Sequence, residues 1–96
     1  MEIQHKESDG EGQFYVQADG DILARMTYAQ PNDKTMIIDH TEVDAALRHQ
    51  KVGYKMVASA VQHARNNGLK IVPECPFVKS VFDKKQEYHD VLQQAN

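Results

Sequence analysis

Thr35-Met36-Ile37-Ile38-Asp39-His40-Thr41-Glu42-Val43 and, after a short gap, Leu47-Arg48-His49-Gln50-Lys51-Val52-Gly53-Tyr54-Lys55 mark the point where the chain changes its hydrophobic period. The first stretch is rich in β-formers, most strongly at Met36-Ile37-Ile38, and predicts a strand. After the second, apolar residues recur at the three- and four-residue spacing of one helical face, which predicts a long helix. These residues are Val52, Met56, Val57, Ala60, Val61 and Ala64.

The residues before this strand predict an antiparallel meander. Strands are expected over Gln13–Gln17 and Ile22–Tyr28, and Met1–His5 can add an edge strand. Asp-Gly pairs are strong hairpin signals, and Pro-Asn-Asp is typical of a turn. The turns are therefore expected at Ser8–Gly12, Ala18–Asp21 and Gln30–Asp33.

The residues after the long helix predict one more strand and a short helix. Gly68 can close the long helix in a left-handed conformation. A strand–helix–strand crossover places the returning strand parallel to Thr35–Val43. We therefore expect an α+β fold: an antiparallel meander, a helix, a parallel strand and a short C-terminal helix. The expected segments are a strand at Leu69–Val72 ending at Pro73, a helix at Pro76–Lys84, a last turn at Glu87–Leu92 and a frayed end at Gln93–Asn96.

Length and composition predict a single domain over residues 1–96. The chain is 41% hydrophobic, which suits one modest core. Its net charge of −3, with no block of basic residues, argues against a nucleic-acid partner. The apolar runs are too short to span a membrane, and one cysteine can form no internal disulfide. We expect a cytoplasmic protein that is a monomer or a weak dimer.

Basic residues surround the start of the long helix. Arg48, Lys51 and Lys55 supply positive charge, and Gly53 would let a ligand approach the backbone closely. Free N–H groups at a helix start suit an anion such as a pyrophosphate. The alternative from the residues alone is an ordinary solvated loop with a few basic side chains.

The segment Arg48-His49-Gln50-Lys51-Val52-Gly53 resembles the pyrophosphate loop of the GNAT superfamily of N-acetyltransferases. That pattern begins with Gln or Arg and has Gly at its fourth position and Gly or Ala at its sixth. Arg48 and Gly53 match its two ends, whereas Lys51 stands where the first Gly is expected. A left-handed conformation there would cost Lys about 1–2 kcal/mol. Its side chain would either crowd the phosphates or pair with them.

The wider resemblance, from about Phe14 to Val91, is to small GNAT-like proteins with a cysteine in the C-terminal strand region. Besides the loop, Ile38–Val43 and Val72–Lys79 carry it. It implies a minimal GNAT-like fold that binds acetyl-CoA, with the strand holding the pantetheine arm and the loop holding the pyrophosphate. The implied cofactor-binding residues are Thr41, Glu42, Val43, Arg48, His49, Gln50, Lys51, Val52, Gly53, Tyr54 and Lys55.

Cys75 is the first candidate catalytic residue. If a helix begins at Pro76, the positive end of its dipole favours the thiolate, with Lys79 helping and Glu74 opposing. The alternative is a small buried hydrophobic residue. The resemblance implies an active-site role, either as an acetyl acceptor or as a group that lines the thioester pocket.

His40 is the second candidate, as a general base at the end of its strand. The alternative is a histidine hydrogen-bonded to Asp39 or Thr41. The other histidines show no metal-ligand spacing, and the sequence therefore predicts no metal site. They are His5, His49, His63 and His89.

These residues lead to one main functional hypothesis and two alternatives. The main one is an N-acetyltransferase that moves an acetyl group from acetyl-CoA to an amine: a protein lysine, a polyamine or a small amine. One alternative is a non-catalytic module that binds acyl-CoA or a protein partner. The other is an interaction domain without a cofactor, which is favoured if Lys51 blocks the loop.

Overall fold

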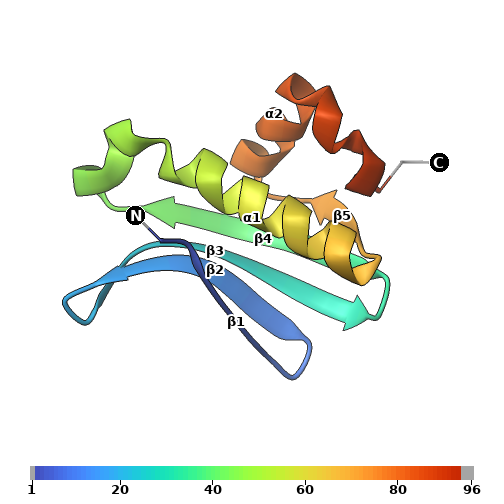
Figure 1. Ribbon diagram of the computed structural model, residues 1–96, viewed down its shortest axis with the longest axis horizontal. Helices are drawn as coiled ribbons and strands as arrows, with labels where there is room; N and C mark the ends of the chain where they lie inside the picture. The colour runs from blue at the N-terminus through green and yellow to red at the C-terminus, as the bar shows by residue number, and fades with distance from the viewer. Residues whose placement is uncertain (1, 94–96) are drawn as a thin grey trace.

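The computed structural model describes residues 2–93 and, within them, a five-stranded sheet in the order β1-β2-β3-β4-β5 (Figure 1). The first four strands form an antiparallel meander, and β5 pairs parallel to β4. The prediction of an α+β fold is therefore confirmed. The strands are β1 Gln4–Ser8, β2 Glu11–Ala18, β3 Asp21–Asn32, β4 Thr35–Val43 and β5 Lys70–Pro73. The helices are α1 Val52–Asn67 and α2 Pro76–Lys84, with 3₁₀ helices η1 Ala45–Gln50 and η2 Gln86–Val91.

One turn differs from the sequence prediction. Gln30–Asn32 belongs to β3, and the turn lies at Asp33 and Lys34. Pro31 is tolerated because the pairing of β3 with β4 is irregular between Ala29 and Asn32. The Asn32 side chain then accepts a hydrogen bond from the Lys34 amide, which tightens the turn one step later than predicted.

The two N-terminal hairpins follow from Asp-Gly pairs. Asp9 and Gly10 have φ of 53° and 81°, and Asp19 and Gly20 have φ of 52° and 84°. Positive φ at both central residues is the requirement of a type I′ turn, whose twist matches that of the paired strands. Both predicted turn regions are therefore confirmed, although β1 begins at Gln4 rather than at Met1, which lies outside the described residues.

One face of the sheet packs on the helices. Ala24, Met26 and Tyr28 alternate inward on β3, and the predicted apolar stripe of α1 is buried against them. The buried residues of α2 join the same core. On the opposite face, Ile37 and Val72 stay partly exposed. We call this opposite face the open face of the sheet.

The C-terminal segment is held against α1. Arg65 donates to both carboxylate oxygens of Asp90, at 2.9 and 2.8 Å, and to the Glu87 carbonyl at 2.7 Å. The Gln93 amide donates to the Ile71 carbonyl, so the prediction of fraying is wrong at Gln93. The rest of that prediction, residues 94–96, lies outside the described part of the chain.

Among the described helices, none has the length and apolar character that crossing a membrane requires.

The Tyr28 ring leaves no room for a side chain at Gly12. A Cβ at Gly12 would lie 2.4 Å from the end of that ring, which is buried and hydrogen-bonded. We expect Gly12→Ala to lower the free energy of unfolding by about 1–3 kcal/mol, the usual cost of overpacking. Urea denaturation measures it. In a Tyr28→Leu background the same change should cost little, and an equal cost in both backgrounds would contradict this explanation.

Candidate functional site

Strands β4 and β5 separate at Ile38. The Ile38 carbonyl accepts hydrogen bonds from the amides of Glu74, at 2.9 Å, and Cys75, at 3.1 Å, just after β5 ends. On the other side of β4, Thr27 pairs with His40 and Tyr28 with Ile38, so Asp39 is an extra, bulged residue. Within the described residues, no strand pairs with the β5 side of β4 beyond Ile38. Residues 39–43 therefore present a free strand edge.

A 3₁₀ helix, which the sequence analysis missed, connects this edge to α1. Asp44 starts η1 by accepting a hydrogen bond from the Ala46 amide, and its own amide donates to the Leu23 carbonyl. Leu47 is buried and anchors the turn in the core. An Asp before Ala-Ala-Leu is the N-cap signal that could have revealed it.

Lys51 adopts the left-handed conformation at the junction of η1 and α1, with φ 57° and ψ 34°. This is the position at which the resemblance expects Gly, and the conformation explains that preference. No described side chain caps the start of α1. The first amides of the helix are therefore open to an anion, and the helix dipole adds positive potential there.

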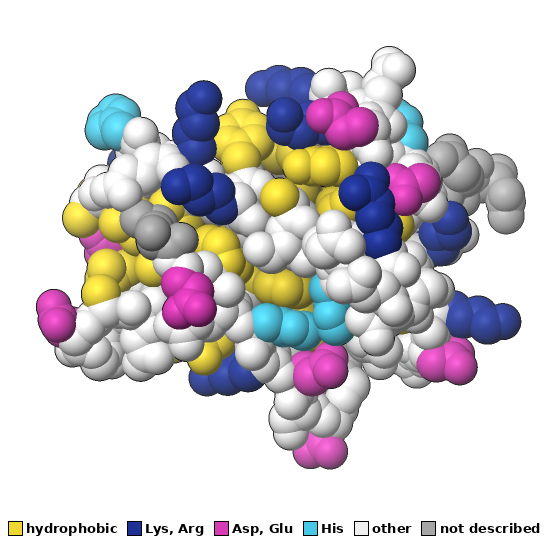
Figure 2. Space-filling view, in the orientation of Figure 1, with side chains coloured by type: hydrophobic (Ala, Val, Ile, Leu, Met, Phe, Trp, Pro, Cys, Tyr) yellow, Lys and Arg dark blue, Asp and Glu magenta, His cyan; other side chains and the backbone are white. Residues whose placement is uncertain are grey.

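A cleft of about 310 Å³ opens at this helix start. Figure 2 shows apolar side chains bordered by Lys and Arg over the region between η1 and α2. Of the predicted cofactor-binding residues, seven line the cleft and four do not. Those lining it are Thr41, Val43, Arg48, Lys51, Val52, Gly53 and Tyr54, joined by Phe77. Those outside the lining are Glu42, His49, Gln50 and Lys55.

Phe77 occupies the space beside Gly53. A Cβ at Gly53 would lie 2.7 Å from the tip of the Phe77 ring, and Tyr54 packs edge-on against that ring at 5.4 Å between centroids. Sequence reasoning assigned the missing side chain of Gly53 to ligand approach. The structure gives a different reason, which is close packing of α2 on α1. Phe77 was not foreseen, because its contact with Gly53 links two helices far apart in sequence.

Cys75 is the N-cap residue of α2, as predicted. It is buried, and its Sγ donates to Oγ1 of Thr41 at 3.3 Å. Cys75 is absent from the cleft lining but contacts Thr41, which belongs to it. The thiol therefore lies directly behind the free edge of β4.

His40 lies on the open face, away from Cys75. Thr41 pairs with the buried Met26 and His40 with Thr27, so alternation turns their side chains to opposite faces. The His40 side chain is 61% exposed, and its Nε2 is 3.2 Å from Oε1 of Glu42, rather than bonded to Asp39 or Thr41. The structure thus places the two catalytic candidates on either side of the sheet.

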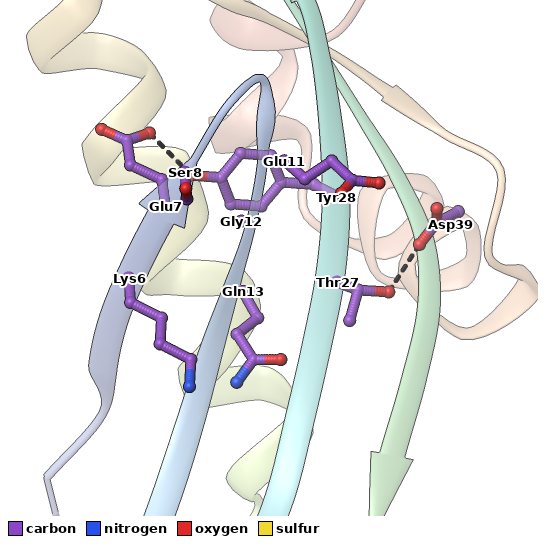
Figure 3. Close-up of a pocket in the computed structure, with 9 residues that line it drawn as sticks. All are labelled: Lys6, Glu7, Ser8, Glu11, Gly12, Gln13, Thr27, Tyr28 and Asp39. Carbon is purple, nitrogen blue, oxygen red and sulfur yellow. Dashed lines mark hydrogen bonds between the residues drawn. The ribbon is translucent and has the colours of Figure 1, made fainter.

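A larger hollow of about 430 Å³ lies beside strands β1–β4 (Figure 3). Its lining offers one Lys and three carboxylates, those of Glu7, Glu11 and Asp39. It has no helix start and an excess of negative charge. It does not suit an anionic cofactor, and the smaller cleft at α1 is the better candidate.

Comparison with solved structures identifies similar folds. A GCN5-like candidate N-acetyltransferase from Staphylococcus aureus is 34% identical with a TM-score of 0.71, covering 99% of this chain and 90% of that one. A GNAT family acetyltransferase from Elizabethkingia anophelis, solved with acetyl-CoA bound, is 14% identical with a TM-score of 0.60, over 80% of this chain and 53% of that one.

A third similar structure is a ribosomal-protein-alanine N-acetyltransferase from Brucella melitensis biovar Abortus 2308. It is 14% identical with a TM-score of 0.59, and the match covers 91% of this chain and 66% of that one. This chain therefore spans about half to two thirds of these two larger enzymes. No curated protein matches the sequence.

The sequence pattern of the GCN5-related N-acetyl-transferase family matches residues 13–91. The match includes β4, the η1–α1 junction and Cys75, which are the elements of the candidate site. The chain belongs to the GCN5-related N-acetyltransferase family.

Proposed function

We propose that residues 1–96 form one domain that transfers an acetyl group from acetyl-CoA to an amine. One observation carries the proposal: an uncapped helix start with basic neighbours opens beside the free edge of β4. An anion site next to an unpaired strand edge suits a ligand with a pyrophosphate and an amide-containing arm. Acetyl-CoA has both.

The pyrophosphate is proposed to lie at the start of α1. Val52 and Gly53 at the helix start line the cleft together with Arg48 and Lys51, and the first amides of a helix have no intrahelical partner. Lys55, one turn into α1, adds charge from outside the lining, and His49 and Gln50 would contribute through the backbone of the loop. Charge-assisted hydrogen bonds to phosphate are stronger than neutral ones, which favours the anionic part of CoA over an uncharged ligand.

The pantetheine arm is proposed to follow β4. In the described part of the chain, residues 39–43 have no strand partner on the β5 side, and their amides and carbonyls can pair with the amides of the arm, as an added strand would. Thr41 and Val43 belong to the cleft lining, and Glu42 lies outside it, so Glu42 would contribute only its backbone. The thioester then lies where β4 and β5 separate, near Ile38 and Cys75.

Direct transfer is the proposed reaction. The amine nitrogen attacks the thioester carbonyl carbon, the C–S bond breaks, and CoA leaves with the electron pair on sulfur. His40, on the open face, takes the proton that the amine loses. We assign Cys75 to the wall of the thioester pocket, because its thiol is buried and bonded to Thr41.

The acceptor is proposed to approach from the open face. Asp39, His40 and Glu42 are exposed there, and the carboxylates of Asp39 and Glu42 favour a cationic amine. A protein lysine, a polyamine and a small amine share that chemistry. An acyl-CoA-binding module without transfer is the rival outcome, in which the cofactor binds and no acceptor is acetylated.

Cofactor binding is tested by thermal denaturation with acetyl-CoA and with CoA. A ligand at about 100 times its Kd stabilises the folded state by about 2.7 kcal/mol, so both compounds should raise the melting temperature. Arg48→Ala should weaken binding about tenfold or more, and more strongly at low salt. Lys34→Ala removes the same charge at the distant β3–β4 turn and is the matched control. A wild-type protein that does not respond to millimolar acetyl-CoA would contradict the proposal.

The left-handed conformation of Lys51 predicts that Lys51→Gly stabilises the protein. Relief of about 1–2 kcal/mol of backbone strain exceeds the entropy cost of Gly, which leaves a gain of about 0.5–1 kcal/mol. Lys51→Ala keeps a Cβ and should show no such gain. Urea denaturation measures both variants. If the Lys51 ammonium pairs with phosphate, both variants also lose affinity for CoA; tighter binding by Lys51→Gly would show that the side chain obstructs the loop.

Direct transfer and a cysteine route differ in their response to Cys75→Ala. We expect this variant to retain transfer activity and His40→Gln to lose most of its kcat, about 10²-fold or more for a lost general base. Mass spectrometry after incubation with acetyl-CoA alone should find no acetyl group on Cys75. An acetylated Cys75, with activity abolished in Cys75→Ala, would replace direct transfer by an acetyl-enzyme mechanism.

A further inference from the structure

Two histidines and a glutamate meet where β1 faces α1. His5 and Glu7 are two residues apart on β1 and therefore point to the same face, and His63 reaches them from α1. One potential ligand atom from each of the three lies within 4.8 Å of those of the other two. Figure 2 shows His side chains gathered next to an acidic one beside α1.

We propose that His5, Glu7 and His63 form a binding site for a divalent transition-metal ion of the zinc class, which ties the edge strand β1 to α1. Two imidazoles and a carboxylate are a common donor set for such ions, whereas Mg²⁺ and Ca²⁺ prefer oxygen ligands. Ligand atoms around a tetrahedral zinc are about 3.4 Å apart, from bond lengths of roughly 2.0–2.2 Å. The ligand atoms of His5, Glu7 and His63 lie within 4.8 Å of one another, and binding would draw them closer.

Neighbouring groups hold the three side chains in place. The His5 ring stacks on Phe14, with centroids 4.2 Å apart and planes 9° apart. The Tyr28 hydroxyl lies between two of the ligands: it is 2.6 Å from Nε2 of His5 and donates to Oε2 of Glu7 at 3.1 Å. Figure 3 shows the Tyr28 ring crossing Gly12 to reach Glu7. Such supporting contacts orient metal ligands and raise affinity.

Each imidazole has one ring nitrogen beside a hydrogen-bonding group and a second nitrogen that can bind a metal. Nδ1 of His63 is 3.4 Å from the Asn67 side-chain amide, which leaves its Nε2 for a metal. Nε2 of His5 lies next to the Tyr28 hydroxyl, which leaves its Nδ1 for a metal. The His5 and His63 rings are in contact, with centroids 4.5 Å apart and planes at 73°.

Such a site would strengthen one border of the sheet. Among the described strands, β1 pairs only with β2, and edge strands open readily. A metal bound to His5, Glu7 and His63 would link that strand directly to the central helix. The proposed cofactor cleft is lined by other residues, so the metal site stands independently of the acetyl-transfer proposal.

The test uses the whole chain, freed of metal by a chelator, with Zn²⁺ and Co²⁺ as probes. We expect one Zn²⁺ per chain by calorimetry, a higher melting temperature with Zn²⁺, and a Co²⁺ absorption spectrum typical of low coordination number. His63→Gln and Glu7→Gln should each weaken Zn²⁺ binding at least about tenfold, since loss of mere supporting contacts costs that much. Their melting temperatures without metal show whether each variant folds.

Two control variants test whether Zn²⁺ binds to histidine or cysteine side chains outside this site. His49→Gln removes an exposed histidine on η1, and Cys75→Ser removes the thiol; both should bind Zn²⁺ as the wild type does. The proposal is overturned if Zn²⁺ leaves the wild-type melting temperature and calorimetric trace unchanged. It is equally overturned if folded His63→Gln binds Zn²⁺ with wild-type affinity, because the ion then lies elsewhere.

Discussion

The separation of β4 from β5 at Ile38 is the constraint on which the candidate site depends. One carbonyl accepts two amide hydrogen bonds, from Glu74 and Cys75, and the chain then turns away into α2. The bulge at Asp39, next to Ile38, changes the direction of β4 at this point. Among the residues that the structure describes, they leave a strand edge without a partner, and native proteins usually cover or protect such an edge. In this fold the proposed cofactor is what would cover it.

The junction of η1 and α1 shows how local strain accompanies a binding geometry. Lys51 is held left-handed because Asp44 caps η1 on one side and Leu47 anchors it in the core. In that geometry no side chain of residues 2–93 caps the first amides of α1. A helix start that is uncapped, strained and flanked by basic residues is poorly stabilised by itself. Its free energy is lowered by an anion, which is a frequent property of ligand sites.

At the opposite border of the sheet, side-chain contacts join β3 to β1. Tyr28 reaches across Gly12 to Glu7 and His5, and this contact between β3 and β1 exists only because Gly12 has no side chain. Because Phe14 and His63 pack on the same His5 ring, side chains from three strands and a helix converge there. The cofactor cleft and this cluster lie toward different ends of α1, near Val52 and near Asn67 respectively. One helix would therefore serve both proposed sites.

The sequence by itself determined the order of elements, the hairpins at Asp-Gly and the bounds of α2, because these depend on local periodicity, turn chemistry and caps. It also pointed to the basic loop and to Cys75 as an N-cap. Tertiary structure alone decided that β3 extends through Pro31, that Phe77 fills the space at Gly53, and that His40 and Cys75 lie on opposite faces. It also decided that His5 and Glu7 meet His63. These features depend on strand register, on the Asp39 bulge and on contacts between residues distant in sequence, and no local pattern encodes them.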